Sequence, residues 1–377
     1  MNKAKIFQCP SCGAALDYYD GDDPTVRCPY CDASVIVPEE LRDKEPAYSP
    51  YGPTPIQIKL PQPTPSKGCA KGCIRTTLIV GVTGLVLLGI AAAVLMMTGD
   101  PLAALSDLLN PPTFADVTLT FGSEGVGPGL FSDARHITVD GEGNIYVGEH
   151  SDGRVQVFDA SGEFVSLWML DAGTTLQGLA ANRQGTVYVV QSGKISIHEG
   201  ATGQLLGQVE YAEGRGFEDV VAAADGGLVA AWYRGNDDIV RFDAQGNAVL
   251  TMSEAISGQS GKSELATRVA VDGLGNIYAL GAFNKGVFKF TPDGKFVTRF
   301  GGDGDNPGQF RAPHAIAVDG QGRVYVGDFK GIQVFDADGR YLDLIAVDGQ
   351  ALGIAFNDQN ELFVIARHQV IKYTLQP

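Results

Sequence analysis

The chain has 377 residues, enough for one large domain and one small one, and its 44% hydrophobic content is that of a folded protein. The net charge of −16 lies in residues 98–377, which hold 19 basic and 35 acidic residues, whereas residues 1–97 hold nine of each. So acidic a surface repels phosphate backbones and argues against nucleic acid as a partner of the larger domain.

The N-terminus carries a cysteine pattern typical of a metal site. Cys9-Pro-Ser-Cys12 and Cys28-Pro-Tyr-Cys31 are separated by fifteen residues, the C-x2-C…C-x2-C spacing of a zinc ribbon. Each C-P-x-C turn directs two thiolates at one tetrahedral ion, and four thiolates leave no open position. The sequence therefore predicts a structural zinc ion bound by Cys9, Cys12, Cys28 and Cys31. Iron and a pair of disulfides are the alternatives, and disulfides require an oxidising compartment.

We assign the zinc ribbon to residues 1–45. A domain this small is not held by its core alone, whereas structural zinc supplies about 10–16 kcal/mol. Its five basic and nine acidic residues argue against binding of nucleic acid, so we expect the ribbon to contact a protein instead.

A linker and an apolar segment follow the ribbon. Residues 46–75 form a proline-rich linker that ends in a basic juxtamembrane segment. Residues 76–97 hold no charge, and as a helix with a rise of about 1.5 Å per residue they span the hydrocarbon core of roughly 30 Å. Basic residues precede this segment and Asp100 and Asp107 follow it. The positive-inside rule therefore predicts a single-pass protein of a prokaryotic cell membrane, with the ribbon cytoplasmic and the C-terminal domain outside.

After a spacer, residues 98–115, the chain repeats one pattern six times over residues 116–377. The residue before the first turn of each copy recurs at intervals of 38 to 49: Asp140, Asn182, Ala223, Asp272, Asp319 and Asn357. A period near 40 residues made of short strands is typical of propeller blades. Each copy predicts four strands joined by tight glycine turns.

The sixth copy ends after three strands. Ahead of the first copy, residues 117–121 read VTLTF and resemble an outer strand. We expect this segment to complete the sixth blade, because a ring closed in this way leaves no exposed sheet edge. The predicted fold is mainly β: a six-bladed propeller, with a small zinc ribbon and one transmembrane α-helix.

Three motifs carry a family resemblance. F-x-x-P-x-x-I-A-V-D at 310–319, GNIY at 143 and 275, and VQVFD and IQVFD at 155 and 332 resemble NHL repeats. The resemblance covers about three quarters of the chain and implies a six-bladed propeller. It says little about function, because NHL propellers serve as protein-, RNA- and ligand-binding platforms, as sensors and sometimes as enzymes.

The mouth of the propeller channel is the predicted ligand site. Residues at the start of the first strands and at the end of the second strands should converge there, and these positions hold more charge than a six-fold repeat requires. The candidates are Arg135, His136, Glu149, Glu218, Asp219, Arg268, His314 and Asp328. Ordinary solvated loops with a few ion pairs are the alternative.

The sequence favours a binding function over catalysis. We expect the propeller to bind an extracytoplasmic protein, peptide or glycan, as a sensor ectodomain or a scaffold. The resemblance also implies an alternative, since some NHL lyases and related six-bladed lactonases hold a catalytic metal at this mouth. His136 and His314 lack a third matching histidine, which weakens that comparison. A structural component of the cell surface is a third alternative.

Overall fold

The computed structural model describes residues 5–8, 15–18, 25–27, 34–36, 114–171, 173–233 and 236–376. The chain divides into two compact units, Met1–Ala91 and Ala92–Pro377.

The described residues of the first unit form two antiparallel strand pairs. These are β1 (Lys5–Gln8) with β2 (Ala15–Tyr18), and β3 (Thr25–Arg27) with β4 (Ser34–Ile36). The pairing of Gln8 with Ala15 makes residues 9–14 a connection between paired strands, and the pairing of Arg27 with Ser34 does the same for residues 28–33. Each C-x2-C motif falls in one of these connections. The four cysteines lie outside the described residues, so zinc binding stays a prediction.

The predicted membrane helix, residues 76–97, also lies outside the described residues. Within the ranges that the structure does describe, no helix has the length and apolar character needed to cross a membrane.

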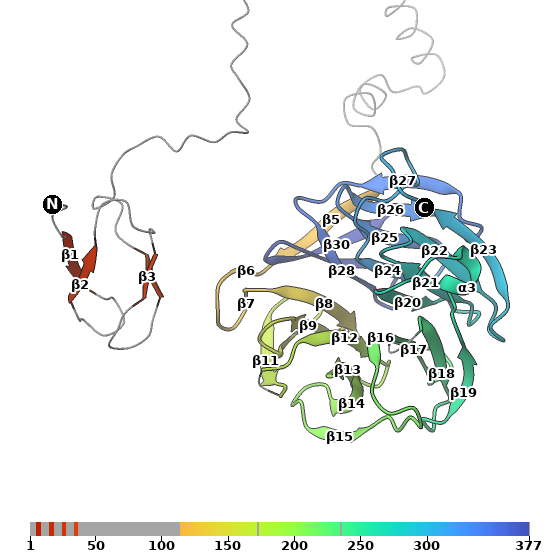
Figure 1. Ribbon diagram of the computed structural model, residues 1–377, viewed down its shortest axis with the longest axis horizontal. Coiled ribbons are helices and arrows are strands. Elements are labelled where there is room, and N and C mark those ends of the chain that lie inside the picture. The colour runs from red at the N-terminus through yellow and green to blue at the C-terminus, as the bar shows by residue number, and fades with distance from the viewer. Residues whose placement is uncertain are drawn as a thin grey trace, which may run out of the picture. The chain divides into compact units, whose positions relative to one another are not determined.

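The second unit is a ring of six antiparallel four-stranded sheets (Figure 1). The first blade consists of β8 (Ala134–Val139), β9 (Ile145–Glu149), β10 (Arg154–Phe158) and β11 (Phe164–Met169). The second consists of β12 (Leu176–Ala181), β13 (Thr186–Gln191), β14 (Lys194–Glu199) and β15 (Leu205–Gln208). The third consists of β16 (Phe217–Ala222), β17 (Leu228–Trp232), β18 (Asp238–Phe242) and β19 (Ala248–Met252). The fourth consists of β20 (Thr267–Val271), β21 (Ile277–Gly281), β22 (Gly286–Phe290) and β23 (Phe296–Gly301). The fifth consists of β24 (Ala315–Val318), β25 (Val324–Asp328), β26 (Gly331–Phe335) and β27 (Tyr341–Ile345). The first strand of each blade is innermost.

The sixth blade joins the two ends of the domain. It consists of β28 (Ala351–Phe356), β29 (Leu362–Ala366), β30 (Gln369–Leu375) and β5 (Ala115–Phe121), with β5 outermost. This is the pairing that the sequence predicts for residues 117–121. Phe121 packs against Phe158 of the first blade, with ring centroids 4.8 Å apart. Gly162, with φ of +83°, allows this approach, since a Cβ there would lie 2.6 Å from the Phe121 ring.

Two short elements lie outside the blades. β6 (Ser123–Glu124) and β7 (Leu130–Phe131) form a small parallel pair in the segment leading into β8, and α3 (Ser257–Ser260) lies between β19 and β20.

The core consists of six hydrophobic clusters, one between each pair of neighbouring blades. Each is built from the aromatic and β-branched residues that the repeat places on the sheet faces. Buried hydrogen bonds repeat as well: the hydroxyl of Tyr146 donates to Asp140 at 2.9 Å, and that of Tyr325 donates to Asp319 at 3.0 Å. The core therefore holds neighbouring inner strands together all the way around the channel.

Candidate functional site

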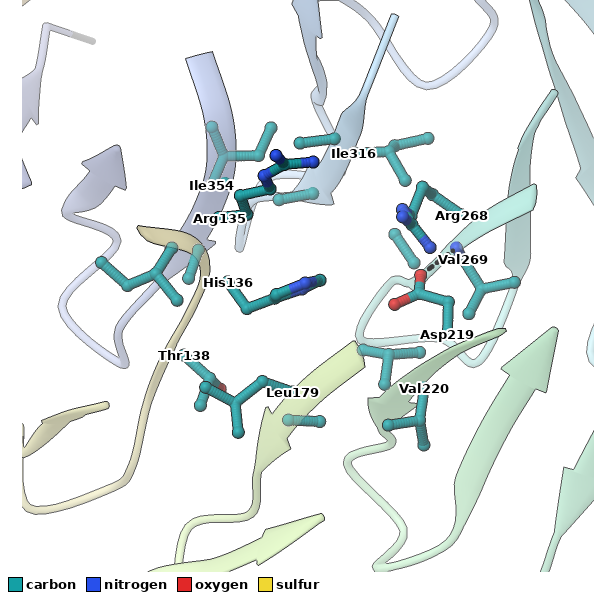
Figure 2. A pocket seen from close by; sticks show the side chains of 18 of the residues that line it. Arg135, His136, Thr138, Leu179, Asp219, Val220, Arg268, Val269, Ile316 and Ile354 are labelled. Carbon is teal, nitrogen blue, oxygen red and sulfur yellow. Dashed lines mark hydrogen bonds between the residues drawn. The ribbon is translucent and has the colours of Figure 1, made fainter. Parts of the chain in front are cut away.

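A cavity of about 570 Å³ lies at the centre of the ring, lined by the inner strands of all six blades. Charged residues stand at the start of these strands, and apolar residues such as Val220, Val269 and Ile316 follow along them (Figure 2). Small-molecule sites in proteins typically measure about 300–1,000 Å³ and combine apolar walls with a few polar groups. The cavity therefore has the size and lining of a ligand site.

Five of the eight residues predicted for the mouth line this cavity: Arg135, His136, Asp219, Arg268 and His314. They belong to the first, third, fourth and fifth blades. Figure 2 shows the side chains of Arg135, His136, Asp219 and Arg268 pointing toward one central space.

Two of the other predicted residues, Glu149 and Asp328, bind main-chain groups of the propeller itself. Both are fully buried at the ends of β9 and β25. Glu149 accepts hydrogen bonds from the main-chain nitrogen of Ser132 at 3.2 Å and from Arg154 Nη2 at 2.6 Å. Asp328 accepts from the main-chain nitrogen of Ala312 at 2.6 Å. Each carboxylate thus satisfies main-chain donors in the segment leading into its blade, and neither lines the cavity.

Glu218 lies next to the cavity without lining it. Its Oε1 accepts a hydrogen bond from the main-chain nitrogen of Thr267 at 3.0 Å, which connects the third blade to the fourth. Burial raises the pKa of Glu218 to about 7.

Asp219 and Arg268 each bond the main chain of the neighbouring strand. Asp219 Oδ2 accepts from the main-chain nitrogen of Val269 at 2.9 Å, and Arg268 Nη1 donates to the carbonyl oxygen of Glu218 at 3.1 Å. Burial raises the pKa of Asp219 to about 6, although the positive charge of Arg268 opposes the shift. Gly178 leaves room for the carboxylate, because a Cβ there would lie 3.1 Å from Asp219 Oδ1.

Two of the histidines that line the cavity, His136 and His314, have lowered pKa values. Burial, with Arg268 adding repulsion, lowers the pKa of His136 well below its usual value and lowers that of His314 as well. Within the part of the chain that the structure describes, the buried Nε2 of His136 has no hydrogen-bond partner. It is the orphaned polar atom of the cavity.

Asp133 is a cavity residue that the sequence prediction missed. It binds Arg135 through two contacts, Oδ1 to Nε at 2.6 Å and Oδ2 to Nη2 at 3.2 Å. Burial favours a higher pKa for Asp133, but hydrogen bonds from Arg135 and Ser151 outweigh it, and the pKa lies below its usual value. The position of an acid two residues before Arg135 was the available signal.

His150 also lines the cavity, and it is not among the eight residues predicted for the mouth. Its Nδ1 lies 2.7 Å from the carbonyl oxygen of Leu176, and its ring centroid lies 6.2 Å from that of His136.

The cavity residues do not fit a catalytic metal ion. Over residues 114–171, 173–233 and 236–376, no three His, Cys, Asp or Glu side chains are grouped closely enough to hold one. Arg135 and Arg268 also lie among the available donors, and their charge opposes the entry of a divalent cation. The site offers Arg268 and Asp219 for recognition of charge, imidazole rings for hydrogen bonding, and an apolar wall.

Comparison with known proteins agrees with this architecture. No family model matches the chain. A stretch of 73 residues, 18% of the chain, is 37% identical to NHL repeat-containing protein 3 of Homo sapiens. That match spans 21% of the human protein, about a fifth of its length.

Solved structures share the fold at low sequence identity. A gluconolactonase from Xanthomonas campestris is 17% identical with a TM-score of 0.52, over 71% of this chain and 98% of that one. A second protein, classed as a gluconolactonase, is 12% identical with a TM-score of 0.55, over 72% and 96% of the two chains. A protein of unknown function from Bacteroides thetaiotaomicron is 16% identical with a TM-score of 0.52, over 68% and 73%. These likenesses establish the propeller fold.

Proposed function

We propose that the propeller is a binding module that takes a small molecule or the end of a peptide into the mouth of its central channel. The observation that carries this proposal is the convergence of Arg135, His136, Asp219, Arg268 and His314 on one cavity of about 570 Å³ with an apolar wall. Groups placed this way fix the orientation of a ligand, while the wall supplies affinity. Among the protein, peptide and glycan ligands expected from the sequence, a peptide end best suits a cavity of this volume that combines charged groups with an apolar wall.

The test combines a ligand screen with a variant of the mouth. Full-length protein is screened against amino acids, short peptides and sugars by thermal shift, and each hit is titrated by calorimetry. A variant with Arg135→Gln, His136→Gln, Arg268→Gln and His314→Gln should lose binding while its melting temperature falls by no more than a few degrees. If a hit binds this variant as tightly as the parent, the ligand site lies elsewhere on the propeller.

In place of the metal-dependent lyase or lactonase that the sequence offers as an alternative, we propose metal-independent lactone hydrolysis as a second candidate function, because Asp219 has its pKa raised to about 6 in a cavity beside an arginine. The fold likeness to gluconolactonases motivates the choice of substrate. In this case Asp219 accepts a proton from a water that attacks the lactone carbonyl, Arg268 stabilises the oxyanion, and the proton passes to the departing ring oxygen. Release of acid from gluconolactone that is lost in Asp219→Asn supports this function. Equal rates for the parent protein and the variant rule it out.

We also propose that residues 1–45 bind one zinc ion and that residues 76–97 anchor the propeller outside the cell membrane. The first proposal is supported by the position of each C-x2-C motif between two paired strands. The second is supported by the charges that flank the apolar segment.

A further inference from the structure

Asp219 and Arg268 have opposite charges on the neighbouring inner strands β16 and β20 but do not pair. Among the described residues, no contact of 4.0 Å or less joins the carboxylate of one to the guanidinium of the other. Each is held by a main-chain bond to the other's strand. A carboxylate accepts about four hydrogen bonds and a guanidinium donates five, so both keep capacity for a partner in the cavity.

Leaving these charges apart has a cost. Both groups are partly buried beside an apolar wall, where a charge without a close partner is unfavourable. The raised pKa of Asp219 reflects this cost, since Arg268 does not fully offset the effect of burial. A ligand that brings a cation to Asp219 and an anion to Arg268 would give each of these partly buried charges a close partner.

The surroundings of Arg268 favour a carboxylate as the anion. Arg135, fixed by its two contacts with Asp133, points toward the same space (Figure 2). A guanidinium binds a carboxylate through paired hydrogen bonds. His136, whose Nε2 is buried and unpartnered among the described residues, can donate a further hydrogen bond to the same group in the tautomer that carries its proton on Nε2. The wall formed by Val220, Val269 and Ile316 then receives an apolar side chain.

We propose that the channel binds a zwitterion with an apolar side chain: a free α-amino acid or a dipeptide. Its carboxylate contacts Arg268 and Arg135, its ammonium contacts Asp219, and its side chain lies along the apolar wall. This inference rests on the proposed binding function and specifies the ligand class of that site.

Calorimetric titration of the full-length protein with four related compounds tests each contact. Leucine and leucyl-leucine carry both charges, N-acetylleucine carries only the carboxylate, and leucinamide carries only the ammonium. Depending on whether the ligand is an amino acid or a dipeptide, we expect leucine or leucyl-leucine to bind at least tenfold more tightly than either single-charge compound.

Two variants make the test specific, and a third is the control. Arg268→Gln should weaken binding of the zwitterion at least tenfold. Asp219→Asn should also weaken it, yet should bind N-acetylleucine more tightly than the parent does, because the repulsion between carboxylates is gone. Arg183→Gln, an exposed arginine in the β12–β13 turn that pairs with Asp358, should leave every affinity unchanged.

The results distinguish a failure of the zwitterion proposal from a failure of the proposed binding function. The zwitterion proposal is wrong if N-acetylleucine or leucinamide binds as tightly as the tighter-binding of leucine and leucyl-leucine, or if neither of these two binds. In that case another compound that binds the parent protein, and not the variant with four substitutions, would still uphold the channel as a ligand site. If no compound distinguishes the parent from that variant, the proposed function fails as well.

Discussion

Replacing the carboxylate of Asp219 by an amide should make the protein more stable at neutral pH. Burial raises the pKa of this group from 3.8 to about 6, so its charged form is disfavoured in the folded state. Asp219→Asn removes the charge and keeps an oxygen that accepts the hydrogen bond from the main-chain nitrogen of Val269. The substitution therefore removes a cost and leaves the local contact intact.

The size of the effect follows from the pKa. The rise from 3.8 to about 6 is about 2 pH units, and at 1.36 kcal/mol for each the charged carboxylate costs up to about 3 kcal/mol. Because part of the side chain still contacts solvent, we expect a gain of about 1–3 kcal/mol in the free energy of unfolding.

The sign of the pH dependence is fixed by linkage. Between pH 4 and 6 the folded protein binds a proton at Asp219 that the unfolded chain has lost, so the contribution of this group to stability falls as pH rises. The advantage of Asp219→Asn should be complete above pH 6 and vanish near pH 4. Urea unfolding of both proteins at pH 4, 5, 6 and 7.5 measures it.

A second aspartate provides a control of opposite sign. Hydrogen bonds from the main-chain nitrogen of Gly227 and from Arg241 hold the pKa of Asp225 below its usual value. Asp225→Asn should therefore lower stability at neutral pH. The reasoning fails if Asp219→Asn is less stable than the parent at pH 7.5, or if its gain is as large at pH 4. A gain confined to high pH would show that this site gives up stability to keep a charge.

Three further predictions concern the ring, the ribbon and the membrane. Phe121→Ala should cost about 2 kcal/mol of stability, less than the roughly 3–5 kcal/mol for a fully buried phenylalanine, because Phe121 is only partly buried. Val117→Ala, at an exposed position of the same strand, should cost less than about 0.5 kcal/mol. Equal changes in melting temperature for the two variants would contradict the role of β5 in closing the ring. Full-length protein should contain one zinc ion and Cys28→Ser should contain none, and unchanged zinc content in the variant would exclude the cysteine site. Protease added to intact cells should remove the propeller and spare the ribbon; the reverse pattern would invert the membrane orientation.

The sequence was sufficient to predict the repeat architecture. Asp140, Asp272 and Asp319 mark the same turn in three blades, and a tyrosine six residues later donates to each in the structure, at distances of 2.9 to 3.2 Å. The three strands of the last copy and the stray segment at 117–121 were enough to indicate how the ring closes. Such features are local or periodic, and the chain displays them directly.

The chemistry of the mouth was only partly predictable. Alternation along a strand predicts that Glu149 and Asp328 occupy equivalent places, but not that the segment leading into each blade covers them and supplies main-chain donors. The separation of Asp219 from Arg268 depends on bonds between two strands 49 residues apart, and no spacing in the sequence reveals it. Asp133 lies in a segment that only the folded ring brings to the channel.

A crystal structure of the full-length protein grown with leucine or leucyl-leucine would show whether the channel binds a zwitterion. We predict one ligand in the central cavity, with its carboxylate within about 3 Å of Arg268 and its ammonium at the same distance from Asp219, as charge-assisted hydrogen bonds require. The zwitterion site is refuted by a ligand that binds on another face of the propeller while this cavity stays free of it, or by one whose charged ends contact neither side chain.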